Sequence, residues 1–149
     1  MKILIGSDHA GFEYKNQLRN YLETKGFEVE DFGAKKFDDN DNYPEILTPL
    51  AFKISENPTE YKGIVLGKSG QGEAIVCNRF PGVRAIVYDG ENLEVVKLGR
   101  EHNDANVLSL GAHFMTIEEA KQAVDTWLET PFSGDERHKR RNKMLDDIG

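Results

Sequence analysis

Cysteine is almost absent from this chain. Its one cysteine, among 149 residues, is Cys77, so no disulfide can form within the chain and no cysteine-rich zinc site can be built. This cysteine content is typical of a reducing compartment, and we expect a cytoplasmic protein.

Positive charge and long apolar runs are scarce as well. There are 19 Lys and Arg residues against 26 Asp and Glu residues, which leaves a net charge of -7 and argues against nucleic acid or an anionic membrane as a partner. Near the start, Ile3 to Ile5 form an apolar run that stops at Gly6, far shorter than a signal-peptide core or a membrane span. Any anionic ligand must therefore be bound by a local cluster of groups.

The sequence also lacks internal repeats, low-complexity tracts and linkers. A length of 149 residues suits one hydrophobic core and is too short for two independent ones. We expect a single domain over residues 1–149.

Short apolar runs instead alternate with amphipathic segments. Buried strands are predicted at residues 3–5, 27–32, 63–66, 83–87 and 107–110. Helices are predicted at residues 12–25, 44–56, 91–102 and 116–130, around 74–76, and after Gly134, with a polar loop at 35–42. Thr116 and Glu119 form a capping-box pattern. The alternation predicts an α/β fold with a five-stranded parallel sheet and helices on both faces.

In such sheets, ligands bind beyond the carboxyl ends of the strands. Asp8 and His9 come directly after the first predicted strand and bring a carboxylate and an imidazole there. Asp8 can equally be a helix cap, with His9 an exposed loop residue. This pair alone is therefore not specific.

A glycine-rich loop, Gly67-Lys68-Ser69-Gly70-Gln71-Gly72-Glu73, follows the third predicted strand. It matches neither G-x-x-x-x-G-K-[ST] nor G-x-G-x-x-G, so it gives little support to nucleotide binding. Such a turn can point backbone N–H groups at an anion, or can simply connect a strand to a helix. With Glu73 as a base, and Ser69 and the amides of residues 70–72 as donors, it suits removal of a proton next to a carbonyl and stabilisation of the enediolate.

Two polar clusters lie further along. Residues 100–106 are either a hydrated loop or a site in which His102 opens a cyclic sugar and Asn103 binds one of its oxygens. Residues 136–143 hold five Lys and Arg residues, and the spacing of Arg137 and Arg141 places both on one helix face, where they can bind one phosphate. A solvated basic face is the alternative.

Taken together and in order, four segments resemble the ribose-5-phosphate isomerase B family over nearly the whole chain. They are residues 6–11, 67–73, 100–104 and 137–141. The resemblance implies a Rossmann-like three-layer α/β/α sandwich with a C-terminal helix, a phosphorylated sugar as substrate, and no metal or organic cofactor. It also implies a homodimer, sometimes paired into tetramers, whose sites are built from both subunits.

The resemblance also distinguishes two branches of that family by their catalytic base. One branch has a cysteine at the end of the third strand, where this sequence has Gly67. The other, known from actinobacteria, uses a glutamate that matches Glu73. Cys77 lies ten residues beyond position 67 and is expected to be a buried small hydrophobe.

By the same resemblance, Glu73 is the base, Ser69 stabilises the enediolate, His102 opens the ring, and Asp8 orients hydroxyls or assists the opening. The resemblance adds His9, Asn103, Arg137 and Arg141 as substrate contacts. From the loop and its surroundings we further expect contacts from Lys68, Ser69, Gly70, Gln71, Gly72 and His113. We expect the side chain of Glu73 to point into a pocket shared with residues 69 and 102.

One departure from the glutamate branch concerns phosphate. An arginine that helps to hold phosphate in that branch aligns with His113, and Lys68 is a candidate to replace its charge.

Two alternatives to a ribose 5-phosphate isomerase stay open. One is an isomerase of a six-carbon sugar, such as allose 6-phosphate or galactose 6-phosphate. The other is a noncatalytic flavodoxin-like module that binds a nucleotide or a phosphorylated signal, which explains the glycine loop and the basic tail but gives no role to Glu73, His102 and Asp8 together.

Overall fold

The computed structural model describes residues 1–34 and 36–148. Its strands are β1 (Lys2–Ser7), β2 (Glu28–Asp31), β3 (Tyr61–Gly67), β4 (Ala85–Tyr88) and β5 (Val107–Gly111). Its helices are α1 (Phe12–Thr24), α2 (Tyr43–Glu56), α3 (Gln71–Cys77), α4 (Glu94–Asn103), α5 (Ile117–Glu129) and α6 (Glu136–Asp146). Short 3-10 helices, η1 (His9–Gly11) and η2 (Ala112–Phe114), follow β1 and β5.

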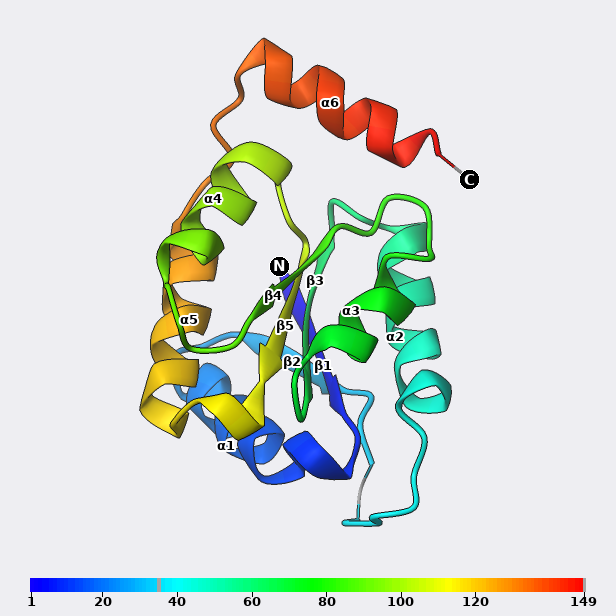
Figure 1. The fold of residues 1–149 in the computed structure, drawn as a ribbon, viewed down its shortest axis with the longest axis vertical. Coiled ribbons are helices and arrows are strands. Elements are labelled where there is room, and N and C mark those ends of the chain that lie inside the picture. Colours follow the sequence, from blue (N-terminus) through cyan, green and yellow to red (C-terminus); the bar gives the residue numbers. More distant parts are fainter. Residues whose placement is uncertain (35, 149) are drawn as a thin grey trace.

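All strands of the sheet run parallel, in the order β2-β1-β3-β5-β4. The α/β fold and the five parallel strands predicted from the alternating pattern are confirmed. The carboxyl ends of all strands therefore lie along one edge of the sheet, the lower edge in Figure 1, and the amino ends along the other.

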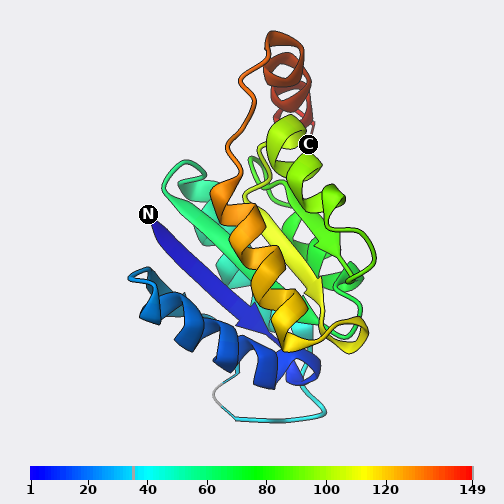
Figure 2. The same ribbon diagram turned by 90° about the vertical axis from the view of Figure 1, so that its left-hand side faces the viewer.

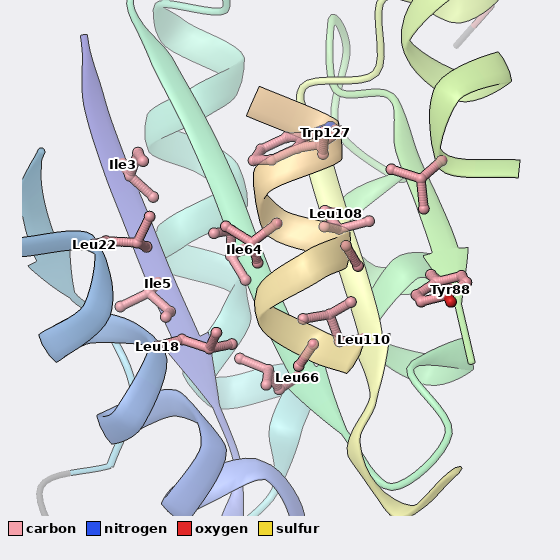
Figure 3. Packing of buried hydrophobic residues seen from close by; sticks show 14 of the residues in the cluster. Ile3, Ile5, Leu18, Leu22, Ile64, Leu66, Tyr88, Leu108, Leu110 and Trp127 are labelled. Atoms are coloured by element: carbon pink, nitrogen blue, oxygen red, sulfur yellow. The ribbon is translucent and has the colours of Figure 1, made fainter. Parts of the chain in front are cut away.

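Successive residues of the central strands point to opposite faces of the sheet. Ile3 and Ile5 of β1 belong to one hydrophobic cluster, whereas Leu4 between them belongs to another. The same alternation occurs in β3 and β5, so strands with continuous apolar runs are buried on both faces. Figure 3 shows the first cluster, with Leu18 and Leu22 packed against β1 and Trp127 packed near the amino ends of the strands.

These two clusters give the molecule three layers. Helices α1, α4 and α5 supply the first cluster and cover one face, as Figure 2 shows for α1 and α5, and helices α2 and α3 supply the second cluster on the other face. Cys77 is fully buried in the second cluster, as the sequence predicted.

The C-terminal helix α6 lies outside these layers, beyond the end of α4 at the amino edge of the sheet (Figure 1). Asp146 of α6 pairs with Arg84, just before β4, at 2.7 Å. The backbone N–H of Ser133 donates to the carbonyl of Glu101 at 3.1 Å and fixes the connection between α5 and α6.

Predicted boundaries differ from the structure mainly at α4, which begins at Glu94 instead of residue 91. The side chains of Asp89 and Asn92 accept hydrogen bonds from the backbone N–H groups of Glu91 and Glu94. Such local bonds favour turns over helix. The polar loop predicted at 35–42 includes residue 35, and the domain predicted at 1–149 includes residues 35 and 149. Both residues lie outside the described part of the chain.

None of the helices in the described part of the chain is long and apolar enough to cross a bilayer.

Candidate active site

Glu73 is a buried carboxylic acid at the carboxyl edge of the sheet. It lies in the first turn of α3, 4% exposed, and its carboxyl group folds back over the α-carbon of Gly67, the last residue of β3. A Cβ at position 67 would overlap the Glu73 carboxyl. The absence of a side chain at residue 67 therefore makes the space in which this carboxyl sits.

The tight turn between β3 and α3 depends on a second glycine. Gly70 has a φ of 79°, a left-handed conformation that favours glycine. Its carbonyl accepts a hydrogen bond of 2.6 Å from the buried Ser109 hydroxyl of β5. The loop is thus fixed to the neighbouring strand, which keeps Glu73 over Gly67.

Burial raises the pKa of Glu73 above its ordinary value, because a carboxylate removed from water loses solvation. The nearby carboxylate of Asp8 raises it further. The structure therefore brings together two carboxyl groups, from the ends of β1 and β3, that the sequence placed sixty-five residues apart.

Asp8 caps a short helix and lies buried near Glu73. Its Oδ1 accepts a hydrogen bond of 3.0 Å from the Ala10 N–H and caps η1, as its alternative interpretation predicted. It is also 6% exposed, and burial raises its pKa. The two interpretations of Asp8 are therefore compatible.

Ser69 and its neighbours line the same edge. The Ser69 hydroxyl accepts a hydrogen bond of 3.2 Å from the Gln71 N–H, which leaves its proton free to donate to a ligand oxygen. Gly72 lies against the hydroxyl of Tyr43, which a Cβ on residue 72 would overlap. The backbone of residues 70–72 connects Ser69 to Glu73 along this edge.

A cavity of about 480 Å³ lies beside this loop. Its lining includes His9 after β1, the exposed Lys68 after β3, and His113 in η2 after β5. The backbone N–H of His113 donates to the carbonyl of Lys68 at 3.1 Å. The structure therefore brings His9, Lys68 and His113 together at this edge.

The second half of the predicted site lies at the other edge of the sheet. His102 and Asn103 end α4, and Asn142 of α6 donates a hydrogen bond of 3.1 Å to the His102 carbonyl. The His102 ring packs on the ring of the buried His138, with centroids 4.3 Å apart. This docking of α6 leaves His102 exposed.

Arg137 and Arg141 lie on α6 with their side chains exposed. The spacing of four residues predicted a common helix face, and the buried residues of the helix, His138 and Asn142, have the same spacing and dock it onto α4. Arg137 and Arg141 belong to the His102 edge rather than to the Glu73 edge.

The pocket predicted to hold residues 69, 73 and 102 does not form within one chain. The strand β3 alone covers seven residues, and at about 3.3 Å per residue it separates the two edges of the sheet by about 20 Å. A substrate the size of a sugar phosphate cannot reach Glu73 and His102 of the same chain at once.

One group of the described residues has the spacing of metal ligands. Asp8, His9 and Asp41 place one ligand atom each within 4.8 Å of one another. The Asp41 Oδ1 and His9 Nδ1 atoms, however, are already 2.8 Å apart as a hydrogen-bonded pair. We treat His9 and Asp41 as a hydrogen-bonded pair beside Asp8.

A family model described as Ribose/Galactose Isomerase matches residues 3–145, which is nearly the whole chain. The chain belongs to the ribose/galactose isomerase family.

Individual members of the family extend the match. A ribose-5-phosphate isomerase B from Mycolicibacterium paratuberculosis is 40% identical over 145 residues, covering 97% of this chain and 89% of its own. The ribose-5-phosphate isomerase B of Escherichia coli is 35% identical, with coverage of 97% and 93%.

Solved structures of the family share this fold. Ribose-5-phosphate isomerase B from Mycoplasma genitalium with bound ribulose-5-phosphate matches with a TM-score of 0.92 and 35% identity, covering 97% of this chain and 93% of its own. The Thermotoga maritima protein matches with a TM-score of 0.90 and 39% identity, with coverage of 99% and 98%.

Within this ribose/galactose isomerase, sequence reasoning missed two residues at the Glu73 edge. Asp41 contacts His9, and Tyr43 contacts Gly72. Asp41 lies in an acidic stretch typical of a solvated loop, and Tyr43 lies at a helix start marked by Pro44. No local signal sets these two apart, because their contacts join segments about 30 residues apart in the chain.

Proposed function

We propose that this protein is an aldose-ketose isomerase that interconverts ribose 5-phosphate and ribulose 5-phosphate, with Glu73 as the base. The observation that carries the proposal is the buried Glu73 carboxyl held over Gly67 beside a loop of hydrogen-bond donors. The names of the reported relatives, and the ribulose-5-phosphate bound to the Mycoplasma genitalium protein, support the choice of substrate.

In the proposed reaction, the Glu73 carboxylate takes the proton from C2 of the open-chain aldose. The C2–H electron pair forms the C1–C2 double bond of the enediolate, and the C1 oxygen becomes negative. The same carboxyl returns the proton to C1, while a proton moves from the C2 hydroxyl to the C1 oxygen, and the ketose results. A carboxyl whose pKa is raised by burial is a stronger base once ionised than an exposed one.

The negative charge of the enediolate needs donors that are already in place. The Ser69 hydroxyl keeps its proton available, and the loop from Gly70 to Gly72 is tied to β5 by the Ser109 hydrogen bond. We assign these groups to the enediolate oxygens. Asp8, close to Glu73, orients the sugar hydroxyls.

The complete site is proposed to form between two copies of the chain. His102, Asn103, Arg137 and Arg141 of one copy would face the Glu73 edge of the other, so that His102 assists ring opening and the arginines bind the phosphate together with His9. In a symmetric dimer, such an arrangement makes two identical sites. We propose this homodimer as the smallest active unit, with pairing of dimers into tetramers as a further step.

Exposed apolar side chains between the two edges support the proposal that a second copy of the chain covers this surface. Ile75 of α3 and Val95 of α4 are 56% and 45% exposed, and Met144 of α6 is 62% exposed. These residues lie on the three helices that carry or flank the two half-sites. Burying them against a second copy would remove apolar area from water.

The alternatives from the sequence are less favoured. The family's description includes galactose, but each relative reported above is named for ribose 5-phosphate. A noncatalytic module gives no reason to bury Glu73 beside Asp8. The cytoplasmic location expected from the sequence stays a prediction.

The test is to replace Glu73 with Gln, which keeps the size of the side chain and removes the base. We expect kcat for ribose 5-phosphate to fall on the order of 10²- to 10⁴-fold. The exposed Glu118→Gln variant, with the same change of charge, should retain full activity.

Both variants and the wild type should be assayed for ketose formation from ribose 5-phosphate, allose 6-phosphate and galactose 6-phosphate. Undiminished turnover by Glu73→Gln would refute the role of the base. If the wild type converts only a hexose phosphate, that sugar is the substrate in place of ribose 5-phosphate. If it converts none of the three, the proposal of an isomerase is rejected.

A further inference from the structure

Asp41, in the loop between β2 and α2, holds His9 through two contacts. Its Oδ1 accepts a hydrogen bond of 3.2 Å from the His9 backbone N–H and lies 2.8 Å from the ring atom Nδ1. An ionised carboxylate can only accept hydrogen bonds, so Nδ1 carries a proton in this pair. Nε2 is then the ring nitrogen that remains for a ligand.

The loop that carries Asp41 is fastened to the body of the protein. Lys15 of α1 donates hydrogen bonds to Asp31 at 3.0 Å and to the carbonyl of Ala34 at 2.9 Å. The side chains of Lys15 and Asp31 are 1% and 4% exposed. Further along the loop, the ring of Phe37 meets the His9 ring edge-on, with centroids 6.1 Å apart. His9 is therefore held before any ligand arrives.

The groups around His9 favour its charged form. Facing it are the carboxyls of Asp8, Asp39 and Asp41 and, in the lining of the same cavity, Glu13, Lys68 and His113. The hydrogen bond to Asp41 raises the pKa of His9 above its ordinary value of 6.5, and this effect outweighs the opposing effect of burial. Charges on Asp8 and Asp39 act in the same direction as Asp41.

The raised pKa of His9 matters for binding a phosphate ester. The second pKa of a phosphate ester is about 6, so the ester becomes a dianion over the range in which an ordinary histidine loses its proton. A histidine that stays protonated to higher pH can pair with the dianion by a charge-assisted hydrogen bond.

We propose that Asp41 is a positioning residue that orients the His9 ring and keeps it cationic, so that Nε2–H binds the phosphate of the substrate. Asp41 acts through His9 and does not touch the sugar phosphate. The inference rests on the proposed function, which supplies the phosphate.

The first test measures the charge of His9 without substrate. The chain has four histidines, and a His9→Gln variant identifies the ring signals of His9 in NMR spectra. The pKa of His9 should fall in Asp41→Asn, which keeps an oxygen acceptor and removes the charge. Asp39→Asn, with the same change of net charge in the same loop, should lower it less, and Asp41→Glu should keep it above the value in Asp41→Asn.

The second test measures the pH dependence of KM for ribose 5-phosphate. At a pH between the His9 pKa values that NMR gives for the two proteins, Asp41→Asn should raise KM roughly tenfold while kcat changes little, because His9 has lost a charge-assisted bond. Well below both of these measured pKa values, the two proteins should have the same KM, since His9 is protonated in both. A loss of loop structure alone would raise KM equally at all pH values.

An unchanged His9 pKa in Asp41→Asn, or a KM defect independent of pH, would overturn this inference and leave the isomerase proposal intact. If the wild type does not turn over sugar phosphates, the proposed function fails. The role of Asp41 is then decided by titrating the His9 ring signals with inorganic phosphate, whose affinity at a pH between the two measured His9 pKa values should be weaker for Asp41→Asn. Equal affinities would overturn the inference.

Discussion

Residues 67 and 73 compete for the same space at the end of β3. The Glu73 carboxyl lies where a side chain on residue 67 would begin. A cysteine at 67, the base of the other branch that the sequence resembles, is sterically incompatible with a glutamate base in this position. A glutamate base at residue 73, in this position, therefore requires glycine at residue 67.

Gly67→Ala should therefore abolish activity without unfolding the protein. The three atoms nearest to the new Cβ all belong to the flexible end of Glu73, which can rotate away, so the melting temperature should change little. Displacing the base should lower kcat on the order of 10²- to 10⁴-fold. Calorimetry and the isomerase assay measure the two effects.

Gly111→Ala provides the contrast. Its Cβ would lie 2.6 Å from the carbonyl oxygen of Ser69, a backbone atom that cannot rotate away, so both stability and activity should fall. Retained activity in Gly67→Ala would show that the carboxyl does not need its present position.

Glu73 also links function to stability. Its pKa is raised in the folded protein, so the folded protein binds this proton more tightly than the unfolded chain does. Stability from this group is therefore gained as the pH falls through the raised pKa and is lost at neutral pH. Glu73→Gln should be more stable than the wild type at pH 7, and its advantage should shrink in acid. Urea unfolding at a series of pH values tests this, and a constant difference at every pH would contradict it.

At the residue scale, the sequence identified groups that follow strands. Asp8, Ser69 and Glu73 could be placed because the carboxyl ends of parallel strands meet at one edge. Asp41 and Tyr43 could not, because they act through tertiary contacts of a loop and a helix start. The space above Gly67 is likewise a property of the folded chain.

At the scale of single elements, α6 shows that helical periodicity predicts a helix but not the residues through which it packs. The basic run predicted a helix with Arg137 and Arg141 on one face, and the helix forms at residues 136–146. No local pattern indicated that His138, among so many charges, is the buried contact that packs on His102. The packing partner of a helix depends on tertiary structure, whereas its existence depends on local spacing.

The capping box at α5 is an element that local sequence determines. Thr116 Oγ1 accepts from the Glu119 N–H at 3.1 Å, and the Glu119 carboxylate accepts from the Thr116 N–H at 2.9 Å. Thr116→Ala should lower the free energy of unfolding by about 1 kcal/mol, whereas Thr116→Ser should keep most of it. Urea midpoints measure the loss, and isomerase activity should not change. An unaltered midpoint in Thr116→Ala would contradict the role of the cap.

At the scale of the whole molecule, the predicted site residues fall into two groups on opposite edges of one sheet. Glu73, Asp8 and Ser69 occupy the carboxyl edge, and His102 and the arginines of α6 occupy the amino edge (Figure 1). The sequence suggested all of these residues, and the place of His102 just before the fifth predicted strand already indicates the amino edge. The edge that Arg137 and Arg141 reach depends on how α6 docks in the fold.

This separation makes the pairing of two chains the central claim. The most direct test mixes two weakened variants, Glu73→Gln and His102→Asn, after joint unfolding and refolding. In a hybrid dimer, one site receives both defects and the other receives neither, so random pairing should restore about a quarter of wild-type activity. As a control, Glu73→Gln mixed with the double variant Glu73→Gln/His102→Asn should restore none. Shared sites predict recovery in the first mixture alone, and activity no higher than that of the separate variants would contradict them.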